Sequence, residues 1–261
     1  MKVIEQLKSL APIPNLENYG SYLFIGPHPD DIEISSGATI SKLVSLGKKV
    51  YFLVITDGGA GSMDHQMDIN KLVSIRLEEM KSSADFLGAK ELFDLGFPDG
   101  GLYHEHEVAK RIASVILDIN PDIVFCPDPY QPSEIHPDHI KAGLATNTAL
   151  LMSAYPLMAK RNLIDFEKEA LPHFRSRTLA YYFTHRSNAF VSTSDQDTSN
   201  RNASISKHVS QFSTPASLEM VLQYLSVRSM IFEEKYQVKN AEGFFALDPV
   251  HQHCFPEINE Y

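Results

Sequence analysis

Short apolar runs alternate with longer stretches of helical periodicity over residues 21–155, and this alternation constrains the fold more than any other feature of the chain. The apolar runs are residues 21–25, 50–55, 91–95 and 122–126, and the helical stretches are residues 32–46, 71–87, 105–119 and 136–155. Strands that alternate with helices of this length form βαβ units with right-handed crossovers and a parallel sheet. The sequence therefore predicts a Rossmann-like α/β fold, with three α/β/α layers built around a mainly parallel sheet.

The pattern changes beyond Pro156. Residues 178–183 and 189–191 are predicted strands, and residues 218–232 are a predicted helix, so C-terminal strands and a helix should be added to the sheet. Residues 192–206 are almost all small and polar, which favours a mobile surface loop. No internal repeat or linker interrupts the 261 residues, and we therefore expect a single domain over the whole chain.

The composition excludes several classes of partner. A formal net charge of -10 argues against nucleic acid, because phosphate neutralisation requires clustered Lys and Arg. The two cysteines, Cys126 and Cys254, are too few for a disulfide framework. The N-terminal residues lack the apolar core of a secretory signal, and no apolar stretch reaches the roughly 20 residues of a membrane span. We expect a cytoplasmic protein with neither a membrane nor a nucleic-acid partner.

Two tetrapeptides of similar design follow predicted strands and open predicted helices: His-Pro-Asp-Asp at 28–31 and His-Pro-Asp-His at 136–139. The carboxyl ends of strands line the ligand crevice of an open α/β sheet, so both tetrapeptides should face the same side. Together they supply two imidazoles and one carboxylate, from His28, Asp31 and His139. Three such ligands with a position left for water are typical of catalytic Zn²⁺.

The remaining residues of these tetrapeptides suit hydrolysis. Asp30 is a spare carboxylate that can act as general base, and His136 can stabilise an oxyanion or protonate a leaving amine. A purely structural explanation also exists, because Asp30 or Asp31 in the first motif and Asp138 in the second could cap helix N-termini. The occurrence of both motifs after separate strands favours the metal site.

Two further pairs of histidines have a metal-ligand or a structural interpretation. His104 and His106, and also His251 and His253, have the spacing of metal ligands. Residues i and i+2 of a helix point apart, and both pairs lie in polar stretches, so these four side chains are predicted to be solvated. His185, in a Thr-His-Arg turn, is a better candidate for lining a substrate pocket.

The motifs resemble those of the PIG-L/LmbE-like zinc deacetylases, in the same order along the chain. The matching segments are IGPHPDDIEISSGATI, TDGGAG, GFPDGGL, PDIVFCPDPY, SEIHPDH, YYFTHRSNAF and AEGFF. They span roughly residues 20–247, and their combination is far more specific than either tetrapeptide. Within the family, the arrangement is most similar to that of the chitooligosaccharide (diacetylchitobiose) deacetylases, and the glucosaminyl-malate deacetylases of bacillithiol synthesis are also similar.

This resemblance implies a zinc site at the carboxyl edge of a Rossmann-like sheet. It implies His28, Asp31 and His139 as the metal ligands. It also implies Asp30 as the general base and His136 as the electrophilic or acid group. A homo-oligomer, either a trimer or a hexamer, is implied as well.

Substrate contacts follow in part from the same resemblance. Arg76 and Asp99 match positions that the family uses to bind substrate. The chain has no Trp, so stacking against a sugar would fall to residues such as Tyr103 and Tyr130. Residues 192–206 lack the aspartate-and-tryptophan pattern that often follows the YYFTH strand, which leaves the substrate preference open.

We expect hydrolysis of the N-acetyl group of an N-acetylglucosamine-type sugar or conjugate, a small-molecule amino sugar, with release of acetate. The alternatives are a glucosaminyl-malate-type deacetylase and a non-catalytic relative that binds sugar or metal. A dinucleotide-dependent enzyme is disfavoured because GPHPDD, and not G-x-G-x-x-G, follows the first strand. A two-metal phosphoesterase would need more carboxylates than the motifs provide.

Overall fold

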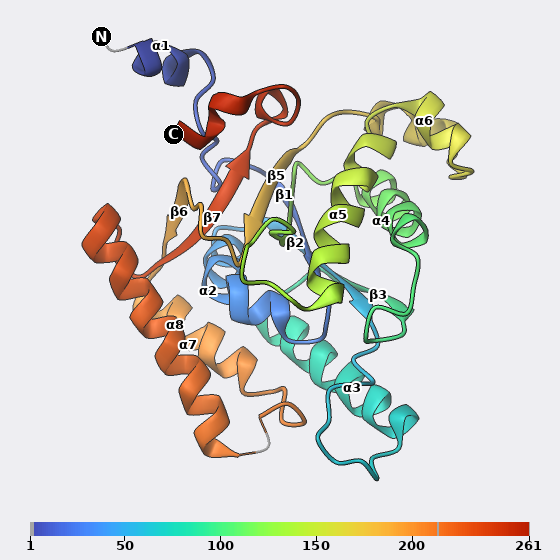
Figure 1. Ribbon diagram of the computed structural model, residues 1–261, viewed down its shortest axis with the longest axis vertical. Helices are drawn as coiled ribbons and strands as arrows, with labels where there is room; N and C mark the ends of the chain where they lie inside the picture. Colours follow the sequence, from blue (N-terminus) through green and yellow to red (C-terminus); the bar gives the residue numbers. More distant parts are fainter. Residues whose placement is uncertain (1–2, 213, 261) are drawn as a thin grey trace.

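The computed structural model describes residues 3–212 and 214–260, and within them it has a seven-stranded sheet of order β3-β2-β1-β4-β5-β7-β6. The strands are β1 (Ser21–Gly26), β2 (Lys49–Thr56), β3 (Glu91–Phe97), β4 (Ile123–Pro127), β5 (Thr178–Tyr182), β6 (Ala189–Ser192) and β7 (Ala241–Leu247). Strands β1 to β5 pair in parallel, and β7 pairs antiparallel with both β5 and β6. The predicted, mainly parallel α/β sheet with added C-terminal strands is confirmed (Figure 1).

Helices cover both faces of this sheet (Figure 1). The α-helices of the described ranges are α1 (Val3–Leu10), α2 (Asp31–Ser45), α3 (Ile69–Leu87), α4 (Glu105–Ile119), α5 (Pro137–Met152), α6 (Pro156–Arg161), α7 (Asp195–Ile205) and α8 (Pro215–Tyr236). Short 3₁₀ helices span Lys168–His173, Pro249–His251 and Pro256–Glu260. On one face, α4 and α5 pack with Leu23 and Ile25 of β1; on the other, α2 and α3 pack with Tyr22 and Phe24. Successive side chains of a strand point to opposite faces, which accounts for a continuous apolar run buried between two helical layers.

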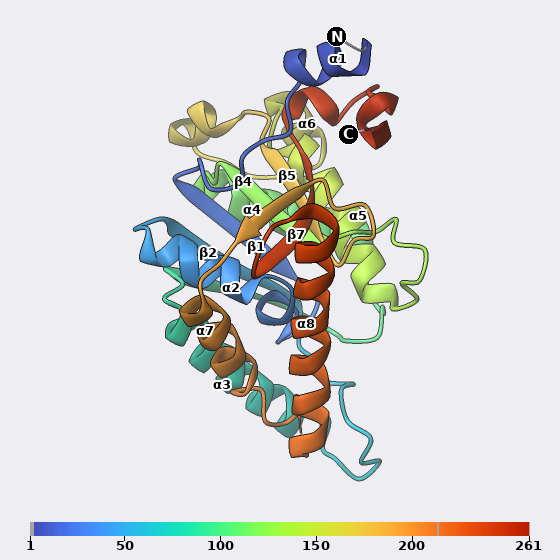
Figure 2. The ribbon, with the colours of Figure 1, turned by 90° about the vertical axis from the view of Figure 1, so that its left-hand side faces the viewer.

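The prediction of a mobile surface loop over residues 192–206 was wrong, because α7 occupies most of this segment. The helix begins with a capping box, in which Ser194 and Asp197 exchange hydrogen bonds. It packs against α2 and α3 (Figure 2), and the guanidinium of its buried Arg201 lies 3.7 Å from the carboxylate of Glu242. The segment lacks apolar periodicity because the helix buries polar side chains that have partners in neighbouring elements.

The last helix, α8, is longer than the predicted 218–232 and begins after Thr214, whose hydroxyl caps its first turn. Figure 2 shows α8 as a long upright helix beside β7, and only Leu225 and Phe232 of its side chains are buried. It is the longest helix of the described residues. No helix in this part of the chain has both the length and the apolar character needed to cross a membrane.

Arg177, just before β5, is a buried cation that holds the ends of other elements together. It is 1% exposed, and its guanidinium donates hydrogen bonds to the carbonyl oxygens of Pro121 (3.0 Å) and His173 (2.7 Å), among others.

Each buried polar group left without a partner costs about 1–3 kcal/mol. We therefore expect Arg177→Met to lower the free energy of unfolding by roughly 3 kcal/mol or more, as measured by urea unfolding. Arg175→Met is the matched control: its side chain is 38% exposed and pairs with Asp122, so it should cost less than about 1 kcal/mol. Equal losses in the two variants would contradict this role.

Candidate metal centre and active site

The two histidine tetrapeptides meet at the carboxyl ends of β1 and β4, which are parallel neighbours in the sheet. The first tetrapeptide connects β1 to α2, and the second begins α5. The ring centroid of His28 lies 4.6 Å from that of His136 and 5.4 Å from that of His139. The predicted convergence of the two motifs at one edge of the sheet is confirmed.

His28, Asp31 and His139 form a group of donor atoms that could hold a metal ion, with all ligand atoms within 4.8 Å of one another. His28 Nδ1 lies 3.0 Å from one carboxylate oxygen of Asp31, and His139 Nε2 lies 3.4 Å from the other. Ligands of a tetrahedral ion, at about 2.0–2.2 Å from the metal, are about 3.4 Å apart. The spacing and the nitrogen and oxygen chemistry of these donors therefore fit a divalent metal ion.

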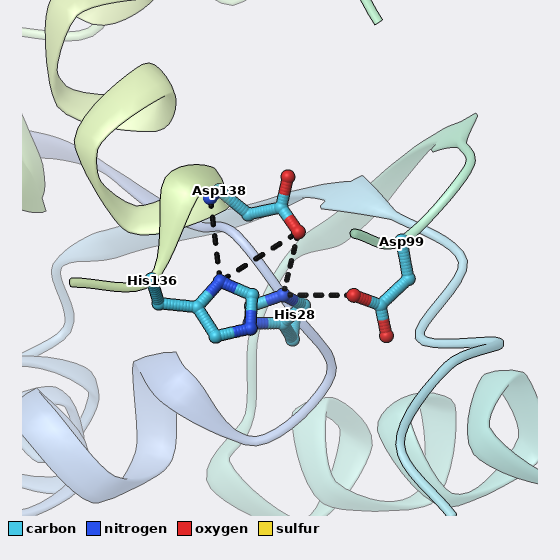
Figure 3. A group of neighbouring side chains, drawn as sticks. All are labelled: His28, Asp99, His136 and Asp138. Atoms are coloured by element: carbon cyan, nitrogen blue, oxygen red, sulfur yellow. Dashed lines mark hydrogen bonds and ion pairs between the residues drawn. The ribbon is translucent and has the colours of Figure 1, made fainter. Parts of the chain in front are cut away.

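A second group of donors shares His28 with Asp99, His136 and Asp138 (Figure 3). Figure 3 shows the carboxylates of Asp99 and Asp138 directed at the same ring nitrogen, and Nε2 of His28 lies 3.3 Å and 3.2 Å from their oxygens. Burial alone would lower the pKa of His28, but hydrogen bonds with the neighbouring carboxylates, Asp138 first, raise it well above its usual range. With Asp31 at the other ring nitrogen, the pocket is strongly anionic and favours a cation.

His136 is the N-cap residue of α5. Its Nδ1 accepts a hydrogen bond from the backbone N–H of Asp138 (3.3 Å). The helix is therefore capped by the histidine, and the Asp138 carboxylate is directed at the site and not at the helix end. Burial, together with the charges of His28 and His139, lowers the pKa of His136. With Nδ1 acting as an acceptor, Nε2 is the ring nitrogen left to carry a proton.

Asp30 lies immediately before α2 with φ = 117°, a conformation that is uncommon for residues other than glycine. Its side chain makes no capping hydrogen bond, so helix capping does not explain this aspartate. One carboxylate oxygen lies 3.5 Å from Nη2 of Arg76. Burial, followed by the charge of the neighbouring Asp31, raises the pKa of Asp30 to about 7. A carboxylate with a pKa near neutrality is suited to taking up and releasing a proton.

Arg76, from α3, is only 3% exposed and lies behind Asp30. Its guanidinium donates hydrogen bonds to the carbonyl oxygens of Pro29 (2.7 Å) and Gly58 (3.0 Å), and so joins the loops that follow β1 and β2. Gly58 has φ = 66°, and a Cβ there would lie 2.6 Å from Nη1 of Arg76, so the close approach requires glycine. The predicted contact between Arg76 and substrate stays a prediction.

Glu134 is a site residue that sequence reasoning missed. Its Oε2 lies 3.1 Å from Nδ1 of His139, and its Oε1 accepts a hydrogen bond from the backbone N–H of His136 (2.8 Å). Nδ1 of His139 has no hydrogen-bond partner among the described residues, so the contact with Glu134 is one of charge, and it helps to raise the pKa of His139. A carboxylate beside the second ring nitrogen of a histidine ligand orients the imidazole and raises its basicity. The only signal in the sequence was the glutamate two residues before the second tetrapeptide.

A cleft of about 570 Å³ opens onto the metal group, with Asp31 and His139 in its lining. His185 also lies in this lining, as the sequence predicted for a pocket residue. Tyr130 is 56% exposed but is not part of the lining, and Tyr103 is 8% exposed. The structure therefore does not bring these two rings into the cleft.

The remaining histidines that resembled ligands lie outside both donor groups. The exposed ones, as predicted, are His104, His106 and His253. The prediction that His251 is solvated was wrong: it is 4% exposed, and its Nε2 lies 3.1 Å from the carbonyl oxygen of Ala11. This contact joins the two ends of the chain, and neither segment indicates it alone.

A buried ion pair behind the first tetrapeptide was also missed. Nε2 of His208 lies 3.1 Å from Oε1 of Glu33, and the two side chains are 0% and 2% exposed. The charge of His208 acts to lower the pKa of the nearby Asp30, against the effect of burial. No local pattern in the sequence connects these residues.

Comparison with known proteins agrees with this geometry. A model of the PIG-L family, described as GlcNAc-PI de-N-acetylase, matches residues 23–150. The diacetylchitobiose deacetylase of Thermococcus kodakarensis is 35% identical over 234 residues, which cover 90% of this chain and 85% of the relative. A probable N-acetyl-alpha-D-glucosaminyl L-malate deacetylase of Bacillus cereus is 34% identical over 135 residues, 49% of this chain and 60% of that protein.

Among solved structures, the N,N'-diacetylchitobiose deacetylase of Pyrococcus horikoshii superposes with a TM-score of 0.85 at 30% identity, covering 98% of this chain and 94% of that one. The resemblance inferred from the motifs is thereby confirmed. The chain belongs to the PIG-L family of deacetylases.

Proposed function

We propose that this protein is a zinc-dependent deacetylase that hydrolyses the N-acetyl group of an N-acetylglucosamine-type sugar or conjugate, such as diacetylchitobiose, and releases acetate. The observation that carries the proposal is the group formed by His28, Asp31 and His139 at a cleft, with the spare carboxylate of Asp30 beside it. Similarity to two diacetylchitobiose deacetylases supports the choice of substrate class.

Two imidazoles and one carboxylate support zinc as the metal, because three such ligands with an open fourth position are typical of catalytic zinc. When bound, the ion would polarise the amide carbonyl and lower the pKa of water from 15.7 towards about 7. His28, Asp31 and His139 would hold it. The carboxylates of Asp99 and Asp138 would keep the imidazole of His28 oriented from its other nitrogen.

Proton transfer is assigned to the chain's own residues. Asp30 would take the proton of the attacking water, since it directly precedes Asp31, its side chain is only 14% exposed and its pKa is raised. Arg76 would hold Asp30 and its loop in place. His136, with Nε2 free to carry a proton, would stabilise the developing oxyanion or protonate the leaving nitrogen.

Substrate contacts are proposed for Asp99, Arg76 and His185, whereas Tyr130 lies outside the lining of the cleft and would reach only a part of the substrate that extends beyond it. His185 has the most direct support, because it lines the cleft. The carboxylate of Asp99, whose oxygen lies 3.3 Å from Nε2 of His28, would accept hydrogen bonds from sugar hydroxyls near the metal group.

A mass-spectrometric screen of the zinc-loaded protein tests the proposed function. The substrates should include N-acetylglucosamine, N,N'-diacetylchitobiose and N-acetylglucosaminyl-malate. We expect loss of one acetyl group from at least one of them, with acetate appearing in equal amount. Unchanged substrates across the panel would refute the assignment and favour a relative that only binds sugar or metal.

Glu134 should strengthen metal binding through His139. We expect Glu134→Gln to weaken zinc binding by about 10–100-fold, because the amide has no charge with which to orient and polarise the imidazole. Competition with a chromophoric chelator measures this affinity directly and does not depend on activity. Glu107→Gln is the control, since that side chain is 57% exposed and pairs only with Lys110 among the described residues. Wild-type affinity in the Glu134 variant would contradict the positioning role.

A further inference from the structure

The cleft extends well beyond the metal group and has two chemically different walls. One wall comes from the loops after β4 and β5 and is mainly polar, with Gln131, Ser133 and His185 in its lining. The other wall is α8, which contributes aromatic, aliphatic and cationic side chains. Clefts of about 300–1,000 Å³ accommodate small organic molecules. This cleft, of about 570 Å³, therefore has room for more of a ligand than the acetamido group that would react at the metal group.

The α8 wall is a single stripe along the helix. Tyr224, Arg228, Ile231 and Lys235 follow one another at spacings of four, three and four residues, and all of them line the cleft. Residues three and four apart lie on one face of a helix, so these side chains form a continuous surface, here called the α8 stripe. Tyr224 is 59% exposed and Ile231 is 52% exposed, so the stripe is open to a ligand.

Neighbouring contacts fix the position of the stripe. Phe232 is buried and packs edge-to-face on Phe190 of β6, with ring centroids 5.2 Å apart. A Cβ on Gly243 of β7 would lie 2.8 Å from the Phe232 ring, so the glycine permits this close packing. The next turn of α8 is held in the same way, because Tyr236 packs on Phe190 at 4.4 Å. The helix is therefore anchored on its sheet side, and the orientation of the α8 stripe is set by the fold.

The two cations of the stripe have no acidic partner. Arg228 lies over the ring of Phe232 (5.4 Å) and Lys235 over that of Tyr236 (4.9 Å), and no carboxylate of the described residues forms an ion pair with either. In a chain of net charge -10, two unpaired cations facing a cleft are available to donate hydrogen bonds to a ligand.

These features match the chemistry of a pyranose ring, which differs between its faces and its edge. A sugar presents C–H groups on its faces, which suit tyrosine and isoleucine, and hydroxyl and ring oxygens at its edge, which suit Arg, Lys and the polar loops. We propose that the α8 stripe binds the distal sugar unit of an N-acetylglucosamine conjugate, while the reacting unit lies at the metal group. This inference rests on the proposed function and adds that the protein selects a disaccharide over a monosaccharide.

Binding to a form that does not turn over tests the proposal. Zinc-loaded Asp30→Asn protein should be titrated calorimetrically with N-acetylglucosamine and with N,N'-diacetylchitobiose. Adding Tyr224→Ala should weaken binding of the disaccharide roughly tenfold and leave the monosaccharide unchanged, since loss of one stacking contact is on this scale. Arg228→Gln should act in the same direction. Met230→Ala is the control on the same helix, being 63% exposed and outside the cleft lining, and should change neither affinity.

The possible outcomes separate this proposal from the proposed function. If the disaccharide binds through α8 but neither sugar loses acetate with Asp30 intact, the deacetylase assignment fails and the subsite stands. If acetate is released while Tyr224→Ala and Arg228→Gln affect both sugars equally or not at all, the subsite is refuted. If Tyr224→Ala lowers the oligomeric mass in sedimentation and leaves sugar selectivity unchanged, the stripe is a contact between copies of the chain and the proposal is overturned.

Discussion

Asp30→Asn should reduce kcat by about 10²–10⁴-fold, which is the usual contribution of a general base. The amide nearly matches the carboxylate in shape but cannot accept the proton of the attacking water. The variant should retain its zinc, because Asp30 is not among the three grouped donors at His28, Asp31 and His139. Steady-state acetate release, together with elemental analysis of the same sample, measures both quantities.

The matched control for this variant is Asp64→Asn, which changes an exposed aspartate in the loop before α3 and should leave kcat unchanged. A kcat near that of the wild type in Asp30→Asn would remove Asp30 from the proton transfer. Loss of zinc along with activity would instead make Asp30 a metal ligand, which also contradicts the assignment.

His139→Ala and Asp31→Asn should each lose the bound metal. Each change removes one of three ligands, and the remaining two donors cannot retain zinc through dialysis against a mild chelator. We expect metal content to fall from about one zinc per chain to near zero, with circular dichroism showing that the fold is kept.

Exposed His104 provides the control for this pair: His104→Ala should keep full metal content. Full occupancy in both ligand variants would exclude the proposed ligand set. Retention in Asp31→Asn alone would also count against it, because the Asp31 carboxylate touches both imidazoles.

The part of the fold that sequence reasoning predicted correctly depends on local and periodic signals. The strand formed by residues 21–26 is a continuous apolar run, and residues 105–119 form the predicted helix with unchanged bounds. The meeting of the two tetrapeptides followed from topology, because adjacent parallel strands present their carboxyl ends at one edge. The topology of the whole sheet therefore predicts that the two local motifs form one site.

The features that were missed depend on partners distant in the sequence. The sequence predicts a loop where α7 lies, because the stability of this helix depends on buried polar contacts, such as Arg201 with Glu242, and not on an apolar stripe. His208 pairs with Glu33 across 175 positions, and His251 contacts Ala11 across 240, so neither has a local signature.

Which aromatic ring is available to stack on a sugar also depends on contacts between residues that are distant in sequence. Tyr103 and Tyr130 are close in sequence to the motifs, yet neither ring lines the cleft. Tyr224 does line it, because Phe232 and Gly243 fix the orientation of α8. The proposed contact with the distal sugar therefore comes from a helix that contains no recognisable motif.

Zinc-dependent deacetylation is tested most simply by acetate release from N,N'-diacetylchitobiose by one preparation, measured after removal of metal with a chelator and again after addition of one equivalent of zinc. We expect no detectable release from the metal-free protein and recovery of release with zinc. In the Asp30→Asn variant the rate recovered with zinc should be lower by about 10²-fold or more. Equal release with and without metal, or none in either state, would contradict it.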